Sequence, residues 1–307
     1  MKVVRIILTV LLSIILALAI LLVGTVYFLR DTLSRKTVVR FMESIDPAEM
    51  SVSDFNISSN VLSDLNLDSE SNLYELIAAF INKNIPDASV TTDQIHDFFE
   101  STGVENIKTF IEEKSGAYMD EFLEGNEEGK IEAEELIELI KSFSDDIKDY
   151  TGIELEEENF DKLKSAFEEM KIERISVSSL KDQYPALNKI GKALSKATFI
   201  ASIVVTALLA LIIILINITH LSTGFKSVAI PSMVVAIIFI VLSGLFALAK
   251  QMIKYLLKGL PFIINNLVDA VSAKPLLLYG LVLFAIGIVL TILSVIMSKA
   301  ERSKENS

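Results

Sequence analysis

Residues 6–29 read IILTVLLSIILALAILLVGTVYFL and contain no charged side chain. About 20 apolar residues in a helix cross the hydrocarbon core of a bilayer, so this run is long enough to span it. Lys2 and Arg5 precede the run as in a secretory signal. The run is longer than the usual signal core of about 7–15 residues, and no small-residue cleavage site follows it before Arg30. The stretch therefore predicts an uncleaved signal anchor.

Three further apolar runs predict transmembrane helices at 197–218, 228–249 and 275–298. None of the four runs contains an acidic, basic or histidine residue, whereas ion pathways and proton relays usually need such groups. Pro231 falls in the first turn of the third predicted span, where its missing N–H is harmless. The most polar side chains in the runs are expected to bond to their own backbone or between helices: Ser202, Thr206, Asn217, Ser243, Thr291 and Ser294.

The charge of the chain is segregated. The whole chain has 307 residues, a mean hydropathy of +0.51 and a net charge of −12. Residues 31–196 carry 37 acidic and 17 basic residues, a net charge of −20, which disfavours binding to nucleic acid. The chain has no cysteine, which excludes disulfides, thiolate zinc sites and iron–sulfur clusters, and its two histidines exclude a histidine-rich metal centre.

Residues 30–196 are expected to form an acidic extracytoplasmic domain, because apolar residues recur there at helical spacing. Thr91 and Gln94 form a capping-box pattern, and Gly152 is expected to end a helix. The pattern predicts helices at 72–83, 104–123, 132–150 and 156–170, a stalk at 32–43 and a short strand at 172–177. The predicted fold class is an all-α membrane protein, with four transmembrane helices and a mainly helical bundle between spans 1 and 2.

Residues 250–274 predict an amphipathic segment, because Lys250, Lys254 and Lys258 share one helix face and Pro261 interrupts the segment. Two readings stay open: an interfacial helix on lipid headgroups, or a helix packed on the acidic domain. Short-loop lysine and arginine residues favour cytoplasmic N- and C-termini, with 299–307 as a cytoplasmic tail, by six bases against four. Counting the bases that flank the long domain would reverse this orientation.

Residues 124–135 resemble the calcium loop of the EF-hand family over these twelve positions. Glycine stands at the sixth position, Ile131 at the eighth, and a glutamate at the twelfth, where the family closes the calcium shell. Glu124 at the first position departs from the aspartate of the family, and a solvated turn between two helices is the alternative. The candidate ligands of Ca²⁺ are Glu124, Asn126, Glu128, Glu132 and Glu135.

No catalytic motif stands out in the sequence. His96 lies beside Asp97 and Glu100, a pattern more typical of a surface residue than of a general base. We therefore expect a non-enzymatic membrane protein whose outer domain binds a partner protein, a cation or an envelope component. A transporter accessory subunit, or a pore formed by a homo-oligomer, is the alternative.

The layout resembles uncharacterised bacterial four-span membrane proteins with an N-terminal anchor and a helical extracytoplasmic domain. The resembling stretches are Leu221-Ser-Thr-Gly-Phe-Lys-Ser, before the third span, and Lys274-Pro-Leu-Leu-Leu-Tyr-Gly-Leu, at the fourth. The resemblance implies a bacterial cell envelope and transfers no activity or site residue.

Overall fold

The computed structural model describes residues 2–44, 49–52, 59–85, 88–100, 103–124, 129–169, 176–256 and 262–305. The chain divides into two compact units, and each is described by itself. The first unit comprises Met1–Thr32, Lys192–Leu256 and Ser272–Ser307. The second comprises Leu33–Gly191 and Leu257–Val271.

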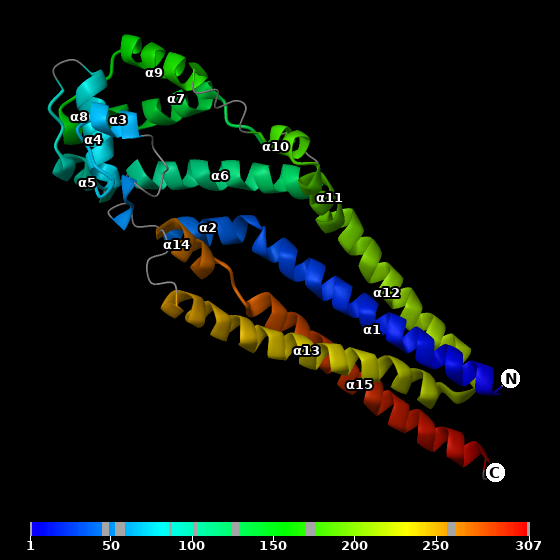
Figure 1. Ribbon diagram of the computed structural model, residues 1–307. Helices are drawn as coiled ribbons and strands as arrows, with labels where there is room; N and C mark the ends of the chain where they lie inside the picture. The colour runs from blue at the N-terminus through cyan, green and yellow to red at the C-terminus, as the bar shows by residue number, and fades with distance from the viewer. Residues whose placement is uncertain are drawn as a thin grey trace. The chain divides into compact units, whose positions relative to one another are not determined.

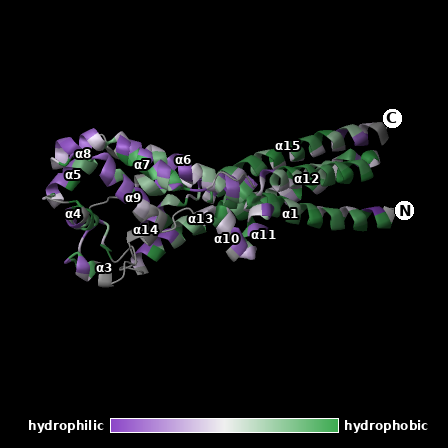
Figure 2. Ribbon diagram, turned by 90° about the horizontal axis from the view of Figure 1, so that it is seen from above, coloured by the Kyte–Doolittle hydropathy of each residue, from purple (hydrophilic) through white to green (hydrophobic). Residues whose placement is uncertain are grey.

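The first unit is built from long apolar helices (Figure 1). They are α1 (Lys2–Thr32), α12 (Lys196–Ile216), α13 (Leu221–Leu256) and α15 (Lys274–Glu305), with a short 3₁₀ turn at Ile218–His220. Within the described ranges, these four helices are long and apolar enough to cross a membrane, as the sequence predicts. Figure 2 shows them apolar along most of their length. Their composition is that of a multi-pass membrane protein.

Successive long helices of this unit run in opposite directions. Near the N-terminus of α1, the Arg5 guanidinium donates to Thr219 Oγ1 at 2.8 Å. At the other end of α1, Arg30 donates to the carbonyl of Leu194, just before α12. The hydroxyl of Ser222 at the start of α13 donates to Glu301 near the end of α15, at 2.6 Å. Both chain ends therefore lie at the same end of the unit (Figure 1).

Small residues allow α13 and α15 to approach closely along their length. A Cβ atom on Gly280 would lie 3.0 Å from the carbonyl oxygen of Ala236 and 2.9 Å from Ile240 Cγ1. Small residues at such positions give transmembrane helices the close backbone contact that holds them together. The buried core of the unit contains Leu16, Ile20, Ile213, Val235 and Phe239.

Pro231 does not lie in a first turn, because α13 begins ten residues earlier, at Leu221, and the proline is inside the helix. Its ring nitrogen cannot donate to the carbonyl four residues earlier, that of Ser227. In place of that bond, the Ser13 hydroxyl of α1 lies 3.0 Å from the Ser227 carbonyl and shares its one proton between this carbonyl and that of Thr9 in its own helix, at 2.8 Å. A side chain from another helix thus satisfies the carbonyl that the proline leaves free.

The second unit is a set of shorter helices. They are α2 (Arg35–Glu43), α3 (Ser59–Asp64), α4 (Leu73–Asn84), α5 (Thr92–Glu100), α6 (Gly103–Glu124), α7 (Ala133–Ser142), α8 (Ser144–Thr151), α9 (Glu157–Glu169), α10 (Val177–Gln183) and α14 (Phe262–Ala270). Helix α11 (Pro185–Leu194) crosses the boundary between the units. Within the described ranges the one isolated β-bridge joins Ser51 to Asn72. The strand predicted at 172–177 lies outside them up to residue 175, and at its last residue the prediction is wrong, because Val177 begins α10.

Local sequence signals set several helix ends in this unit. The Thr91–Gln94 capping box is confirmed: the Gln94 amide donates to Thr91 Oγ1 at 3.3 Å, and the Thr91 amide donates to Gln94 Oε1 at 2.9 Å. Gly152 caps α8 in the left-handed region, with φ of +73°, where glycine alone escapes the steric penalty of a Cβ. Asn72 caps α4 by accepting a 2.9 Å bond from the Glu75 amide.

Two predicted helices are interrupted. The stalk at 32–43 does not continue the first span, because α1 ends at Thr32 and α2 begins after Ser34, which is extended. The helix predicted at 132–150 is broken at Phe143, whose φ and ψ of −123° and 22° are not helical. The break lets the Phe143 ring, which is only 7% exposed, pack against Phe98 at 5.8 Å between ring centroids. Periodicity continues through both breaks and therefore hides them.

The segment at 250–274 is not one helix. Its first residues continue α13 to Leu256, and α14 begins at Phe262. Helix α14 belongs to the second unit, where the Arg40 guanidinium of α2 donates to the Ala270 carbonyl at 3.1 Å. A positive side chain at the C-terminal carbonyls of a helix is favourable. This geometry supports the reading in which α14 packs on the acidic domain.

Candidate functional site

The second unit contains an apolar cavity of about 410 Å³. Six helices contribute to its wall: α4, α5, α6, α7, α8 and α9. Most of the lining is isoleucine, phenylalanine and leucine, and the polar or charged lining residues are Thr151, Asn159 and Lys162. Ligand pockets in proteins commonly measure about 300–1,000 Å³ and are mostly apolar with a few polar groups. The volume and the lining both fit that class.

An aromatic cluster supports one side of the cavity. The Phe98 ring lies 5.6 Å from Phe99, 5.8 Å from Phe143 and 6.3 Å from Tyr150, measured between ring centroids. Such edge and tilted contacts add stability beyond the area that they bury. The break at Phe143 is what brings this ring into the cluster. The rings are therefore held by their neighbours and do not simply collapse into the space beside them.

The cavity opens to solvent. Phe80 lines it and is 41% exposed, which places this ring at a mouth. At the α4–α5 corner, Asn82 of α4 pairs with the backbone of Val90: its amide donates to the Val90 carbonyl at 2.8 Å, and its oxygen accepts from the Val90 N–H at 2.7 Å. These two hydrogen bonds hold the end of α4 against the segment that leads into α5. Two walls of the cavity are thus connected rigidly.

A second, polar hollow of about 450 Å³ adjoins the apolar cavity. The two share four lining residues: Ile85, Ile153, Asn159 and Lys162. The remaining lining of the hollow is Ala88, Gly152, Glu154, Glu156 and Glu158. The apolar cavity and the polar, acidic hollow are therefore adjacent and share part of their lining.

The charged side chains of the hollow are partly paired. The Lys162 ammonium lies 2.8 Å from Glu158, and the Lys148 ammonium lies 3.0 Å from Glu154. The hydrogen bond and the positive charge of Lys162 lower the pKa of the Glu158 carboxyl, so it is ionised at neutral pH. In the part of the chain that the structure describes, Glu156 has no ion-pair partner. The three carboxylates and two ammonium groups leave a local net charge of −1.

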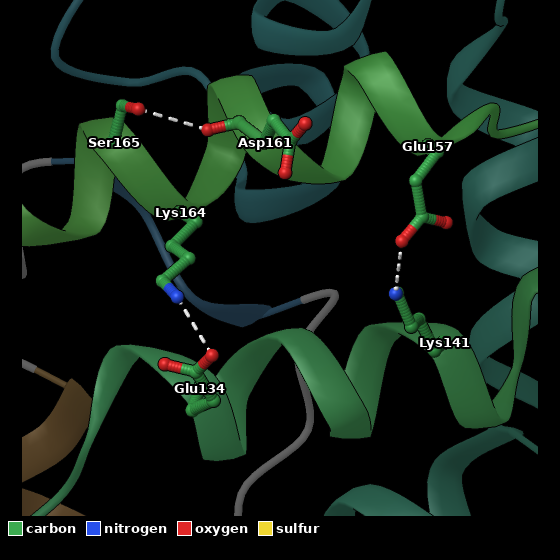
Figure 3. Close-up of polar contacts among 6 residues, drawn as sticks. All are labelled: Glu134, Lys141, Glu157, Asp161, Lys164 and Ser165. Carbon is green, nitrogen blue, oxygen red and sulfur yellow. Dashed lines mark hydrogen bonds and ion pairs between the residues drawn. The ribbon is translucent and has the colours of Figure 1, made fainter.

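Two ion pairs hold α9, which carries three of the lining residues, against α7 (Figure 3). The Lys141 ammonium lies 2.9 Å from Glu157, and the Lys164 ammonium lies 2.6 Å from Glu134. The Lys141 ammonium also lies 4.9 Å from the centroid of the Phe160 ring, within reach of a cation–π contact. Pairs as exposed as these add about 1 kcal/mol or less each, so they orient α9 more than they stabilise it.

The candidate calcium loop is only partly described, because residues 125–128, and with them Asn126 and Glu128, lie outside the described ranges. Glu124 ends α6, and Glu132 immediately precedes α7. Glu135 already has partners: it binds the Lys114 ammonium and accepts from the Glu132 amide at 3.1 Å. Burial raises the pKa of Glu135, but the bonds from Lys114 and from the Glu132 amide outweigh this and leave it lowered.

Among the described residues no group of three or more histidine or carboxylate side chains is arranged to hold a metal. To close a calcium shell, Glu135 would have to exchange its contact with the Lys114 ammonium for the cation. Calcium binding at 124–135 stays a prediction.

His96 is a partly exposed residue of α5. Its ring lies 3.5 Å from Asp97 and from Glu100, and edge-on to Tyr74 at 5.6 Å between centroids. It does not line the apolar cavity.

The polar side chains of the long helices have partners inside the chain. Asn217 is 2% exposed and donates to Thr9 Oγ1 at 3.0 Å and to the Ile213 carbonyl at 2.9 Å. Ser243 and Ser294 donate to backbone carbonyls of distant residues, at 3.2 and 2.7 Å. Three further hydroxyls, those of Ser202, Thr206 and Thr291, donate to carbonyls of their own helix. The first three side chains therefore join residues far apart in the sequence, and the other three bond to their own backbone, as expected for polar residues in spans.

The sequence shows apolar residues at helical spacing in this domain but not the cavity that they enclose. Each stripe reads as ordinary core, and only the arrangement of six helices shows that their apolar faces leave a space. No family model, curated protein or solved structure matches the chain.

Proposed function

We propose that this chain is a non-enzymatic, multi-pass membrane protein whose helical domain binds an apolar or amphiphilic component of the cell envelope. The observation that carries the proposal is the apolar cavity of about 410 Å³, which opens to solvent beside Phe80. A cavity of about 150 Å³ lined by apolar side chains already binds benzene in another protein. The larger space here accommodates a short acyl chain or a ring system.

The proposal places residues 30–196 outside the cytoplasm of a bacterial cell, with both termini inside. Its support is the two bases before the first span, the count of bases in the short loops, and a layout with an even number of candidate spans. A fusion of alkaline phosphatase near residue 150 should be active, and a fusion at residue 307 inactive. The opposite pair of results would reverse the orientation without affecting the cavity.

Ligand binding is tested on the full chain in phosphatidylcholine nanodiscs, with isoleucine δ1 methyl groups as NMR probes. Hexanol should produce saturable shifts at Ile77 and Ile147, which line the cavity, and not at Ile190, which is exposed outside it. Ile147→Trp fills only part of the cavity, so it should weaken the binding of hexanol that is measured at Ile77 and leave it saturable. Shifts that rise linearly at all three positions in the wild type would show that hexanol only partitions nonspecifically, and the proposal would fail.

A transporter accessory subunit, or a pore formed by oligomerisation, is the second candidate. Its motivation is the set of serine and threonine side chains in the long helices. These groups already have partners within one chain, which favours a binding protein over a pore. Ion flux across liposomes that contain the purified protein would favour the pore.

Calcium is the candidate cation. Titration calorimetry of the full chain with millimolar Ca²⁺ is the test, and Glu135→Gln is the matched variant because it removes the twelfth-position ligand. Heat in the wild type that disappears in the variant would establish the site, and no heat in the wild type would end the idea.

A further inference from the structure

The adjoining polar hollow determines which kind of amphiphile the cavity takes, an inference that rests on the proposed function. We propose that the ligand carries a positively charged head group, which occupies the acidic hollow while its apolar part occupies the cavity. The ligand class is therefore a cationic amphiphile, such as an alkylamine or an aminoacylated lipid.

The cavity and the hollow are adjacent, because Ile85 and Ile153 line both. In this proposal an extended molecule lies across these two residues, with its apolar end in the cavity and its polar end in the hollow. The apolar end replaces water against isoleucine and phenylalanine, which is favourable in proportion to the area buried. The polar end reaches groups with which it can form hydrogen bonds or ion pairs.

The second step is the charge at the polar end. Both ammonium groups near the hollow are already in ion pairs: Lys162 with Glu158, and Lys148 with Glu154. The exposed Glu156 carboxylate has no ion-pair partner among the described residues. An anionic head group would meet this charge and would have to displace a glutamate to reach a lysine. An ammonium head group can instead donate to Glu156 and to its neighbours.

The electrostatic field of the whole acidic domain also favours a cationic head group. Residues 31–196 carry a net charge of −20, which lowers the local concentration of anions and raises that of cations. Most membrane amphiphiles with a single negative charge are therefore disfavoured at the mouth. The arrangement selects partly by repulsion, a common route to specificity.

The carboxylates also have a structural use, because acidic residues in the first turn of α9 complement the positive end of its helix dipole. That role predicts effects on stability alone. A dependence of binding on the charge of the ligand is the readout that separates the two roles.

The experiment compares three six-carbon probes on the full chain in phosphatidylcholine nanodiscs: hexylammonium, hexanol and hexanoate. Binding is followed by the methyl shifts of Ile77, Ile85 and Ile153. The dissociation constant should be lowest for hexylammonium and highest for hexanoate, with a difference of about threefold or more that shrinks as salt is added. Glu156→Gln should reduce this difference by about twofold to threefold and leave hexanol binding unchanged.

Glu138→Gln removes the same charge from an exposed position on α7 that lines neither space, and it should leave the preference intact. Equal affinities for hexylammonium and hexanoate, or a preference for hexanoate, would overturn this inference while hexanol binding upheld the cavity. Saturable binding of none of the three probes would refute the proposed function itself.

Discussion

Replacement of Ile147 by tryptophan tests whether the space in the helical domain is a cavity or a filled core. Ile147 lies on α8 and lines the space, whose volume is about 410 Å³. The larger indole ring has room to enter without displacing the aromatic cluster around Phe98. Filling part of an existing cavity stabilises a protein, whereas inserting the same ring into a packed core costs about 1–3 kcal/mol. The sign of the stability change therefore decides between the two descriptions.

The magnitude follows from the volume. An apolar ring fits a cavity of about 150 Å³, and the difference between tryptophan and isoleucine is a fraction of that volume, on the order of 50 Å³. At about 24 cal/mol for each Å³ of cavity removed, the gain is about 1 kcal/mol. The immobilised side chain loses rotamer freedom, so the net gain is expected to lie between about 0.5 and 1 kcal/mol.

The assay is hydrogen exchange of the full chain in nanodiscs, followed by mass spectrometry of peptides from α5 and α8. Exchange of these amides reports the free energy of local opening. Ile147→Trp should slow their exchange by about twofold to fivefold, because each 1.4 kcal/mol corresponds to a factor of ten. Ile190→Trp, at an exposed position of α11, is the matched control and should leave α5 and α8 unchanged. Faster exchange in α5 and α8 of the Ile147 variant would refute the cavity.

Three further predictions concern the contacts that hold each unit together. Ser13→Ala removes the donor that satisfies the carbonyl left free by the proline in α13, and the thermal midpoint in detergent should fall by an amount equivalent to about 1 kcal/mol. Ser202→Ala removes only a hydrogen bond to a carbonyl of its own helix, so it should lower the thermal midpoint much less. Gly280→Ala should destabilise the first unit by about 1–3 kcal/mol in the same melting assay, because the added methyl group meets the backbone of α13. Gly244→Ala, where a Cβ meets nothing within 4 Å, should be neutral or slightly stabilising, and equal effects of the two would contradict the packing. Glu135→Gln should cost about 1 kcal/mol or less by hydrogen exchange of α7 at pH 7. The difference from wild type should begin to shrink as the pH falls below the ordinary carboxyl pKa of 4.5 and should vanish once the pH is below the lowered pKa of the folded state. The direction follows because the Glu135 carboxyl has a lower pKa in the folded state than in the unfolded state. Its ionised form therefore stabilises the fold at neutral pH, and this stabilisation is lost when the carboxyl is protonated. A stability difference between variant and wild type that grew at low pH would exclude the bond to Lys114 as its source.

The four long apolar helices could be predicted from the sequence alone, because each is an uncharged apolar run of more than 20 residues, which the acidic domain does not contain. The sequence also determined most of the helix ends in the acidic domain. The Thr91–Gln94 capping box and the left-handed Gly152 are local devices, so residues close in sequence suffice to specify them.

Tertiary structure alone decided the breaks and the cavity. Helical periodicity continues through Phe143, but the ring packs against Phe98, 45 positions earlier in the chain, and that distant contact accompanies the break. Pro231 is tolerated inside α13 because a serine more than 200 residues away supplies the missing donor. The cavity and the polar hollow arise from the fit of several helix faces. Volume left between packed side chains depends on how elements distant in sequence meet, and a one-dimensional pattern contains no measure of it.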